Sequence, residues 1–274
     1  MIVGLLSPGA MGAAVGRTLV DRGHQVVVAL DDRGSASVRR ASAAGLSNVG
    51  VLRALVDEAD LVLSIVPPDQ ALGVARSVEA AGWAGPYVDA NAVAPATAAE
   101  IHAAVGGSFV DGDLIGGPPR PGGGTRLFLS GPGAAALAPE LSGDGLTSEV
   151  LDGGPYAASA LKMAYAAWTK GTAALLLIIR AFAQAEGVED ALLAEWARSQ
   201  PDLPDRAELA RDVVPRGWRF AGEMDEIASA FAAQDLPDGF AAAAAEAYRR
   251  LAAFKDVDPA PDLAAVAEAM RREA

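Results

Sequence analysis

The chain has 274 residues, of which 51% are hydrophobic, and it carries a formal net charge of −13 with no cysteine. This length and apolar content suit one large globular domain or two ordinary ones. The negative charge disfavours nucleic acid and anionic membranes as partners, because both repel an acidic surface. The lack of cysteine excludes disulfides, thiolate metal sites and a cysteine nucleophile.

No segment has the pattern of a targeting or membrane-spanning sequence. The N-terminus is apolar from Ile2 without a basic stretch before it, which is not typical of a signal peptide. The most apolar stretch, 172–182, is too short to span a bilayer and contains Arg180. We therefore expect a cytoplasmic protein without a membrane span.

Short β-rich runs alternate with helical patterns over the first half of the chain. Strands are predicted at 2–6, 25–30, 61–66 and 87–89, near 109–110 and at 126–130. Helices are predicted at 11–22, 70–81 and 96–105. This alternation predicts an α/β Rossmann domain with a mostly parallel sheet covered on both faces.

From about Ala157 the pattern is helical to the C-terminus, with prolines separating several helices. We place the boundary near Gly153 and Gly154. The prediction is a dinucleotide-binding domain at 1–153 and an all-α domain for substrate and dimerisation at 154–274.

The turn after the first strand is glycine-rich. A dinucleotide fingerprint needs glycines for a tight turn, for close approach of the pyrophosphate, and for helix–strand packing. Gly9 and Gly12 fill the second and third roles, while Ser7 stands where the first glycine is expected. The helix after the turn would direct its first amides at the pyrophosphate. The cofactor-binding residues predicted here are Ser7, Pro8, Gly9, Ala10, Met11 and Gly12.

The end of the second strand bears on the choice between NAD and NADP. An acidic residue there, Asp31 or Asp32, would bind a ribose hydroxyl and favour NAD. Arg33 with Ser35 would instead hold a 2′-phosphate. The residue that faces the ribose decides between the two, and we predict NADP with NAD as the alternative.

Two further strand ends are candidate cofactor contacts, because ligands of such sheets bind at the carboxyl ends of the strands. Val66 and Pro67 end one strand, and Asn91 follows another where the nicotinamide would lie. The alternative for both is an ordinary strand-to-helix turn, with Asn91 as an N-cap.

With these residues assembled, the chain resembles the β-hydroxyacid dehydrogenase family, which includes 3-hydroxyisobutyrate and 6-phosphogluconate dehydrogenases. Three segments carry the resemblance: LLSPGAMG at 5–12, DGDLIGGPPRPGGGTRLFLSGP from Asp111, and LKMAYAAWTKG from Leu161. The combination of DANAVAP, KMAYAAWTKG and WRFAGEMDEIA is most similar to a bacterial subgroup with a divergent C-terminal helical domain. The resemblance covers nearly the whole chain.

The resemblance implies that Lys162 is the catalytic acid/base. Hydride transfer to a carbonyl leaves an alkoxide that needs a proton, and a partly desolvated lysine can supply it, whereas arginine does not give up its proton. Helical spacing places Tyr165 and Thr169 on the same helix face as Lys162, so both are predicted to bind the substrate.

The sequence departs from the family pattern on the substrate side. The family has an asparagine where this chain has Tyr165, a serine where it has Ile115, and a lysine where it has Met224. Gly116 and Gly117 keep the backbone amides that would orient a substrate. In the loop that follows, Arg120 is the candidate for a substrate anion.

We therefore predict an NADP-dependent dehydrogenase or reductase for a small alcohol/carbonyl pair, with no metal site. Family resemblance and the apolar run at 173–179 imply a homodimer through the helical domain. Two alternatives stay open: an imine reductase of the same architecture, and a non-catalytic NADPH-binding protein that reports redox state.

Overall fold

The computed structural model describes residues 1–271, and the chain divides into two units, Met1–Met163 and Ala164–Ala274. The division falls inside the long helix α7 (Ala157–Ala185), whereas the boundary expected from sequence, 153–154, lies just before this helix. Each unit is described by itself.

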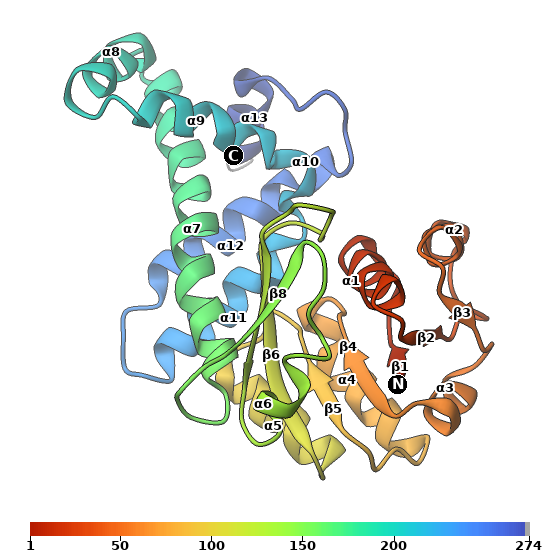
Figure 1. The fold of residues 1–274 in the computed structure, drawn as a ribbon. Helices are drawn as coiled ribbons and strands as arrows, with labels where there is room; N and C mark the ends of the chain where they lie inside the picture. The colour runs from red at the N-terminus through yellow and green to blue at the C-terminus, as the bar shows by residue number, and fades with distance from the viewer. Residues whose placement is uncertain (272–274) are drawn as a thin grey trace. The chain divides into compact units, whose positions relative to one another are not determined.

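The first unit is built on an eight-stranded sheet in the order β3-β2-β1-β4-β5-β6-β7-β8 (Figure 1). The pairs are parallel except for β6–β7, which confirms the predicted mostly parallel sheet. The strands are β1 (Ile2–Leu5), β2 (Gln25–Val28), β3 (Ser47–Asn48), β4 (Leu61–Ser64), β5 (Tyr87–Asp89), β6 (Phe109–Ile115), β7 (Thr125–Ser130) and β8 (Leu146–Val150). The helices are α1 (Ala10–Asp21), α2 (Ser35–Ala43), α3 (Leu52–Glu58), α4 (Pro68–Ala80), α5 (Pro95–Val105) and α6 (Ala134–Leu137).

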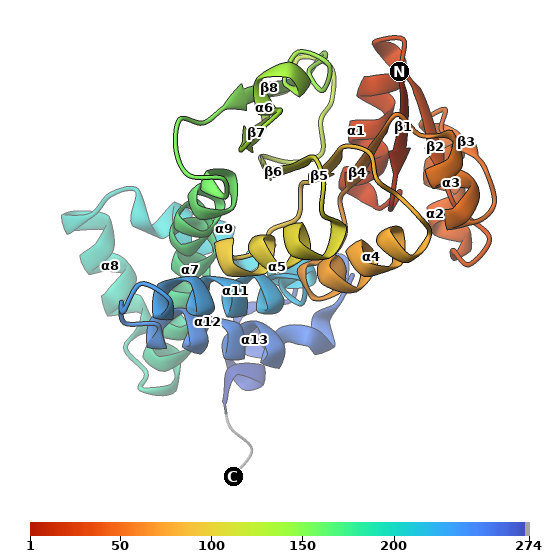
Figure 2. The ribbon, with the colours of Figure 1, turned by 90° about the horizontal axis from the view of Figure 1, so that it is seen from below.

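Helices cover both faces of this sheet, as Figure 2 shows. On one face, apolar side chains of the strands pack with α1, α2 and α6. On the other, the next residues along the strands pack with α3, α4 and α5. Side chains of a strand alternate between the faces, so each central strand contributes to both cores. Packing of helices on both faces of the sheet holds the ends of the strands in place, and several candidate site residues lie at those ends.

The structure contains elements that the sequence pattern did not predict: α2, β3, α3, α6 and β8. The helix α2 was missed because its sequence, SASVRRASA, is polar and buries only Ala41. The strand β6 is longer than the expected run at 109–110, because Asp111 and Asp113 interrupt its apolar pattern although both are buried.

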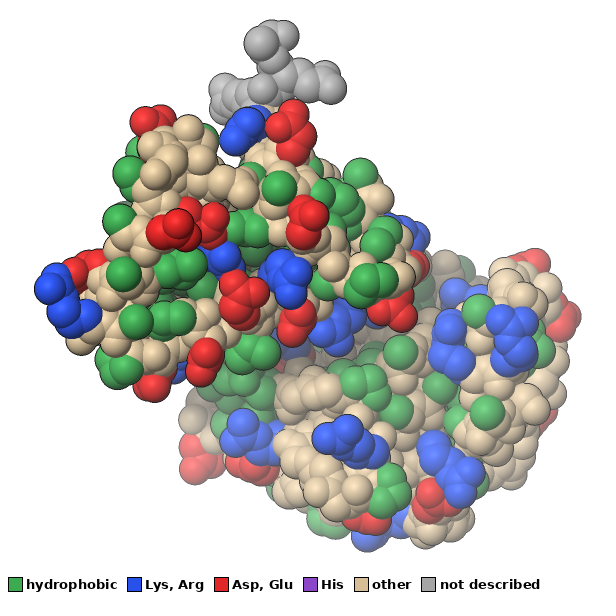
Figure 3. All heavy atoms as spheres, turned by 90° about the horizontal axis from the view of Figure 1, so that it is seen from above, with side chains coloured by type: hydrophobic (Ala, Val, Ile, Leu, Met, Phe, Trp, Pro, Cys, Tyr) green, Lys and Arg blue, Asp and Glu red, His purple; other side chains and the backbone are tan. Residues whose placement is uncertain are grey.

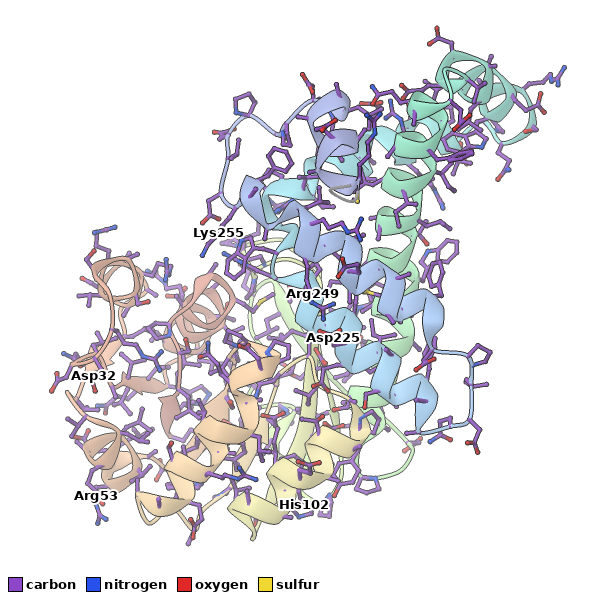
Figure 4. All side chains as sticks on the ribbon, turned by 180° about the vertical axis from the view of Figure 1, so that it is seen from behind. Asp32, Arg53, His102, Asp225, Arg249 and Lys255 are labelled. Carbon is purple, nitrogen blue, oxygen red and sulfur yellow. The ribbon has the colours of Figure 1, made fainter. Side chains whose placement is uncertain are left out.

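The second unit is helical over its described residues, as predicted. Its helices after α7 are α8 (Glu189–Ser199), α9 (Leu203–Asp212), α10 (Val214–Gly217), α11 (Phe220–Ala232), α12 (Gly239–Arg250), the short 3₁₀ helix η1 (Leu251–Phe254) and α13 (Leu263–Met270). Asp225 of α11 and Arg249 of α12 point toward one another and form an ion pair (Figure 4). Arg180 of α7 is buried and pairs with Glu189 and with Glu208. Charged contacts thus tie neighbouring helices together.

By length and composition α7 is apolar enough to cross a membrane. The helix also carries the buried, doubly paired Arg180, and in the first unit Ala158 and Leu161 pack into a cluster with strand residues. These contacts are those of a core helix. Figure 3 shows acidic and basic side chains interspersed over the face seen from above, without a continuous basic surface there.

Candidate functional site

The glycine-rich turn between β1 and α1 has the close packing that its sequence requires. A Cβ atom on Gly12 would lie 2.1 Å from the carbonyl oxygen of Ser7, so only glycine lets α1 approach the turn this closely. A Cβ on Gly9 would have no atom within 4 Å. Gly12 therefore closes the turn against the helix, whereas the side of the turn at Gly9 stays open.

The N-terminus of α1 has open backbone donors. The amide of Ala13 donates to the carbonyl of Gly9 at 2.9 Å, and no side chain among the described residues caps the helix. The first turn has no acidic residue. The first amides of a helix have no intrahelical acceptor, and the helix dipole adds partial positive charge there. Amides at Ala10, Met11 and Gly12 thus suit the pyrophosphate of a dinucleotide.

A cavity of about 320 Å³ lies at the end of β2. Asp31, Asp32 and Arg33 line it together with residues of α3 and α4. Asp32 lies at the outer edge of the first unit (Figure 4), and Ser35 is exposed as the first residue of α2. Both acidic residues and Arg33 therefore line the same cavity. The carboxylates suit a ribose hydroxyl, and the guanidinium suits a phosphate attached to the ribose.

Two arginines reach back to the turn from the region after β2. The guanidinium of Arg33 donates to the carbonyl of Leu6 at 3.1 Å, and that of Arg40 donates to the carbonyl of Pro8 at 3.0 Å. Neither forms an ion pair with a described acidic residue. Both arginines therefore place positive charge beside the glycine-rich turn, and their hydrogen bonds stabilise the backbone of that turn.

The side chain of Asn91 is buried and fully engaged with protein groups. Its oxygen accepts from the amide of Val66 at 2.6 Å, and its nitrogen donates to the hydroxyl of Ser64 at 3.0 Å and to the carboxylate of Asp89. This network joins the ends of β4 and β5. Pro67 is exposed just beyond it, as the residue before α4.

Lys162 lies on the first turns of α7, within the first unit. Its ammonium donates to the carboxylate of Asp113 and to the carbonyl of Leu114, both at 2.7 Å. The side chain of Lys162 is only 12% exposed and that of Asp113 is 2% exposed. The lysine thus presents a partly desolvated ammonium at the carboxyl end of β6.

Asp111, two residues earlier on the same face of β6, anchors the start of α7. Its carboxylate accepts from the amide of Ser159 at 2.9 Å and from the hydroxyl of Ser159 at 2.6 Å. The hydroxyl of Ser130 donates to Asp111 at 2.9 Å and accepts from the amide of Ala158 at 3.0 Å. A negative charge at a helix N-terminus is stabilising, so Asp111 and Ser130 fix the helix that carries Lys162.

Three carboxylates, those of Asp89, Asp111 and Asp113, lie on neighbouring positions of β5 and β6, where Asp89 pairs with Asp111 in register. Burial raises the pKa of Asp89 well above its usual value, with Asp111 and Asp113 adding repulsion. Burial also raises the pKa of Asp111, against the opposing hydrogen bonds of Ser159. Burial raises the pKa of Asp113 to about 6, although Lys162 lowers it. Burial thus raises the pKa of all three carboxyl groups in this part of the sheet.

The loop after β6 connects it to the antiparallel strand β7. Gly116 has a positive φ of 123°, which favours glycine, and the carbonyl of Gly117 accepts from the hydroxyl of Thr125 at 2.7 Å. Ile115 is buried against Phe128 and Ala158, so its side chain belongs to the core. Both glycines are exposed next to the strand end that holds Lys162.

Arg120 lines a groove of about 670 Å³ along α1 and α2 and forms no ion pair with a described residue. Its carbonyl, by contrast, is packed inside the loop, where a Cβ on Gly145 would lie 2.0 Å from it. The groove places this side chain beside α1.

Tyr165 and Thr169 belong to the second unit. The tyrosine is 44% exposed, and the threonine hydroxyl donates to its carbonyl at 3.2 Å. Met224, which stands where the family has a lysine, is fully buried. Lys170 pairs with Glu223 and lies over the ring of Phe220.

Sequence reasoning missed Asp111 and Asp113. A signal was available: two acidic residues alternate within an otherwise apolar strand, which places both on one buried face. A buried carboxylate needs a partner, so the pattern implied hydrogen-bond donors or a cation from another element. The donors are Ser130, Ser159 and Lys162.

Two family models match parts of the chain. Residues 1–80 match the NADPH-binding domain of acetohydroxy acid isomeroreductase, and residues 183–251 match a domain of unknown function, DUF1932. Comparison with curated proteins gives no match.

Solved structures match nearly the whole chain. A conserved protein of unknown function, described as similar to 3-hydroxyacid dehydrogenases, is 27% identical, with 93% of this chain and 99% of that chain covered and a TM-score of 0.66. A Mycobacterium tuberculosis 3-hydroxyisobutyrate dehydrogenase with L-serine is 20% identical, with 99% of each chain covered and a TM-score of 0.68. A Streptomyces aurantiacus imine reductase is also 20% identical, with 99% and 100% covered and a TM-score of 0.52.

These matches confirm the predicted fold class and, at the level of the fold, the resemblance to the hydroxyacid dehydrogenases. The chain has a dehydrogenase-like fold whose N-terminal part is similar to an NADPH-binding domain.

Proposed function

We propose that this protein is an NADP-dependent oxidoreductase that interconverts a small-molecule carbonyl compound and its alcohol, with Lys162 as the proton donor. One observation carries the proposal: the partly buried ammonium of Lys162 lies at the carboxyl end of β6, in a chain whose first 80 residues match an NADPH-binding domain. Ligands of such sheets bind at the carboxyl ends of the strands.

The chemistry needs one hydride and one proton. When bound, the reduced nicotinamide supplies the hydride to the carbonyl carbon. Lys162 gives a proton from its ammonium to the carbonyl oxygen, which becomes the hydroxyl, and the resulting amine recovers a proton from water. Two of the three ammonium hydrogens are held by Asp113 and Leu114, which leaves one to direct at a substrate oxygen. Exposed amides at Gly116 and Gly117 would orient that substrate.

For the cofactor, we propose that the open N-terminus of α1 and the space beside Gly9 hold the pyrophosphate. The contacts would come from the turn residues Ser7 to Gly12, with Val66, Pro67 and the Asn91 network supporting the nicotinamide side. We propose NADP over NAD because Arg33 lines the cavity at the end of β2 without an acidic partner, and Ser35 begins the next helix. A 2′-phosphate gains a charge-assisted hydrogen bond there.

For the substrate, we propose a carbonyl compound without a carboxylate next to the reacting carbon. The family serine is replaced by Ile115, whose side chain is buried in the core, and the ammonium of Lys162 is already paired with Asp113. A substrate anion would therefore rely on the backbone amides of Gly116 and Gly117, or on Arg120 beside α1.

The test is NADPH oxidation at 340 nm with a panel of aldehydes, ketones, 2-oxoacids and 3-oxoacids. We expect turnover with uncharged carbonyls and loss of that turnover in Lys162→Ala. Lys255→Ala removes an exposed lysine that lies over Trp218 and is the matched control. Tight NADPH binding with no turnover, unchanged by Lys162→Ala, would contradict the proposal and favour the non-catalytic redox-sensing alternative.

An imine reductase is the second candidate, because one solved structure with this fold is an imine reductase. Imine reduction also needs a proton donor, so the geometry around Lys162 is compatible with both imine and carbonyl reduction. The discriminating measurement compares cyclic imines with the matching cyclic ketones under the same conditions. Reduction of the imines alone would replace the carbonyl assignment.

We also propose a homodimer formed through the second unit. Large apolar side chains lie exposed along α7 at helical spacing, among them Trp168 at 63% and Phe182 at 66% exposure, with Leu175 and Ile178 between them. An exposed apolar stripe of this kind marks an interface. Light scattering should give twice the chain mass of 27.8 kDa, and Phe182→Arg should reduce it to the single-chain value.

A cytoplasmic location, without nucleic-acid or membrane partners, is also proposed. It is supported by the net charge of −13 and the lack of cysteine. Cell fractionation with an antibody to the protein tests it.

A further inference from the structure

Lys162 and Asp113 form a nearly buried ion pair that the proposed chemistry does not by itself require. The two residues are 49 positions apart, on α7 and β6, and their charged atoms are 2.7 Å apart. The same carboxylate oxygen of Asp113 also accepts from the amide of Leu114 at 2.6 Å. Its other oxygen is buried without a hydrogen-bond partner among the described residues. One carboxylate oxygen of Asp113 thus accepts the hydrogen bond from the lysine.

The surroundings make Lys162 the single cation facing this carboxylate among the described charged groups. Asp111, on the same strand face, is satisfied by Ser159 and Ser130, and its charge opposes that of Asp113. Asp89, on the neighbouring strand, also repels Asp113. A buried carboxylate with one cationic partner and two acidic neighbours depends strongly on that partner.

We propose that Asp113 is a positioning residue that acts through Lys162: its carboxylate holds the ammonium of the lysine at the carboxyl end of β6. A charged group that is nearly buried needs a partner of opposite charge, and Asp113 is that partner for Lys162. The inference rests on the proposed role of Lys162 as proton donor, but the geometry of the pair can be tested without turnover.

The test uses reductive methylation of the purified full-length protein with formaldehyde and cyanoborohydride, followed by mass spectrometry. The chain has only three lysines, 162, 170 and 255, so each can be quantified. Only the neutral amine reacts. An opposite charge within about 4–6 Å changes the ammonium-to-amine ratio of a lysine about tenfold or more. At pH 7, Asp113→Asn should therefore raise the labelling of Lys162 relative to Lys255 about tenfold.

Asp113→Asn keeps the shape of the side chain and an acceptor for the lysine, so it removes the charge and little else. If that variant does not fold, the smaller Asp113→Ser makes the same test. Asp57→Asn is the control, because it removes an exposed carboxylate from its pair with Arg53. Unchanged Lys162 labelling in a folded Asp113 variant would overturn the inference, and so would an equal rise in the Asp57 control.

A second measurement tests the ion pair between Lys162 and Asp113 through the pH dependence of kcat/KM. Since the pKa of Asp113 is raised to about 6, the rate should fall on the acid side as its carboxylate becomes protonated and releases the lysine. We expect kcat/KM of the wild type to show this acid limb and Asp113→Asn to lack it. A retained limb in the variant would overturn the inference. A labelling change without turnover on any carbonyl would instead overturn only the proposed function.

Discussion

The N-termini of α1 and α7 show two uses of the same helix physics within the first unit. Both present backbone amides and the positive end of a helix dipole. At α1 no described side chain caps these amides, and the turn beside Gly9 is open. At α7 the amides of Ala158 and Ser159 are taken by Ser130 and Asp111.

The difference indicates which end is available for an external anion and which is part of the scaffold. An uncapped helix start leaves its donors to water or to a ligand, whereas a start filled by a buried carboxylate holds the helix in place. The first suits the cofactor, and the second fixes the backbone that carries Lys162. Substitutions at the two ends should therefore affect different properties.

The largest effect is expected from Lys162→Ala. Loss of a general acid reduces turnover about 100-fold to 10,000-fold, because the developing alkoxide then lacks a proton donor. NADPH affinity should stay within about twofold, since Lys162 contacts β6 and not the α1 turn. Steady-state kinetics and fluorescence titration with NADPH measure the two. An equal loss of affinity and turnover would show that Lys162 belongs to the cofactor side.

Asp111→Ala should destabilise the protein by removing the carboxylate that anchors the N-terminus of α7. It leaves the amide and hydroxyl of Ser159 without their acceptor in a buried place. We expect the free energy of unfolding to fall by about 3 kcal/mol, because hydrogen bonds to a charged group and buried unsatisfied donors each cost about 1–3 kcal/mol. Urea unfolding measures it, and exposed Asp57→Ala serves as the comparison. A loss below about 1 kcal/mol would contradict the anchoring role.

Gly12→Ala and Gly9→Ala should separate packing from binding at the α1 end. The Cβ of the first variant would meet the Ser7 carbonyl oxygen at 2.1 Å, which should cost about 2 kcal/mol of stability, as overpacking does. The second variant has open space and a φ of −65°, so the free protein should keep its stability. Its methyl group should still weaken NADPH binding about tenfold. Equal NADPH affinity in Gly9→Ala and the wild type would remove the pyrophosphate from this turn.

Arg33→Ala tests the cofactor preference at the end of β2. We expect NADPH affinity to fall about 10-fold to 100-fold and NADH affinity to change little, because a charge-assisted hydrogen bond to the 2′-phosphate is lost, worth about 1.5–3 kcal/mol. Equal losses for both cofactors would mean that Arg33 acts only by bracing the carbonyl of Leu6.

The smallest effect is the pH dependence that Asp113 adds to stability. Its pKa is about 6 in the folded protein and about 3.9 in an unfolded chain, so the folded state binds more protons between these values. The contribution is fully present below pH 4 and is lost as the pH rises through 6. From pH 7 to pH 5 the wild type should gain about 1 kcal/mol relative to Asp113→Asn. Thermal or urea unfolding at both pH values checks this difference, and a gain in the variant equal to that of the wild type would contradict it.

The sequence by itself determined the fold class and the candidate cofactor turn. Alternating apolar strands and helical patterns act locally, and so does the spacing of Gly9 and Gly12 after the first strand. The sequence pattern did not predict segments with weak local signals: α2 is polar with one buried residue, and β3 consists of two exposed residues. Lys162 was found through family resemblance and the apolar residues beside it.

Only the tertiary structure decided how Lys162 is held. Its partner Asp113 and the anchor Asp111 lie 49 and 48 positions from the α7 residues that they bind. Sequence periodicity indicates which strand face is buried, but it does not indicate which distant element supplies the counter-charge. That pairing arises when the start of α7 packs on the face of β6 that carries both carboxylates, because buried charges require partners within hydrogen-bond distance.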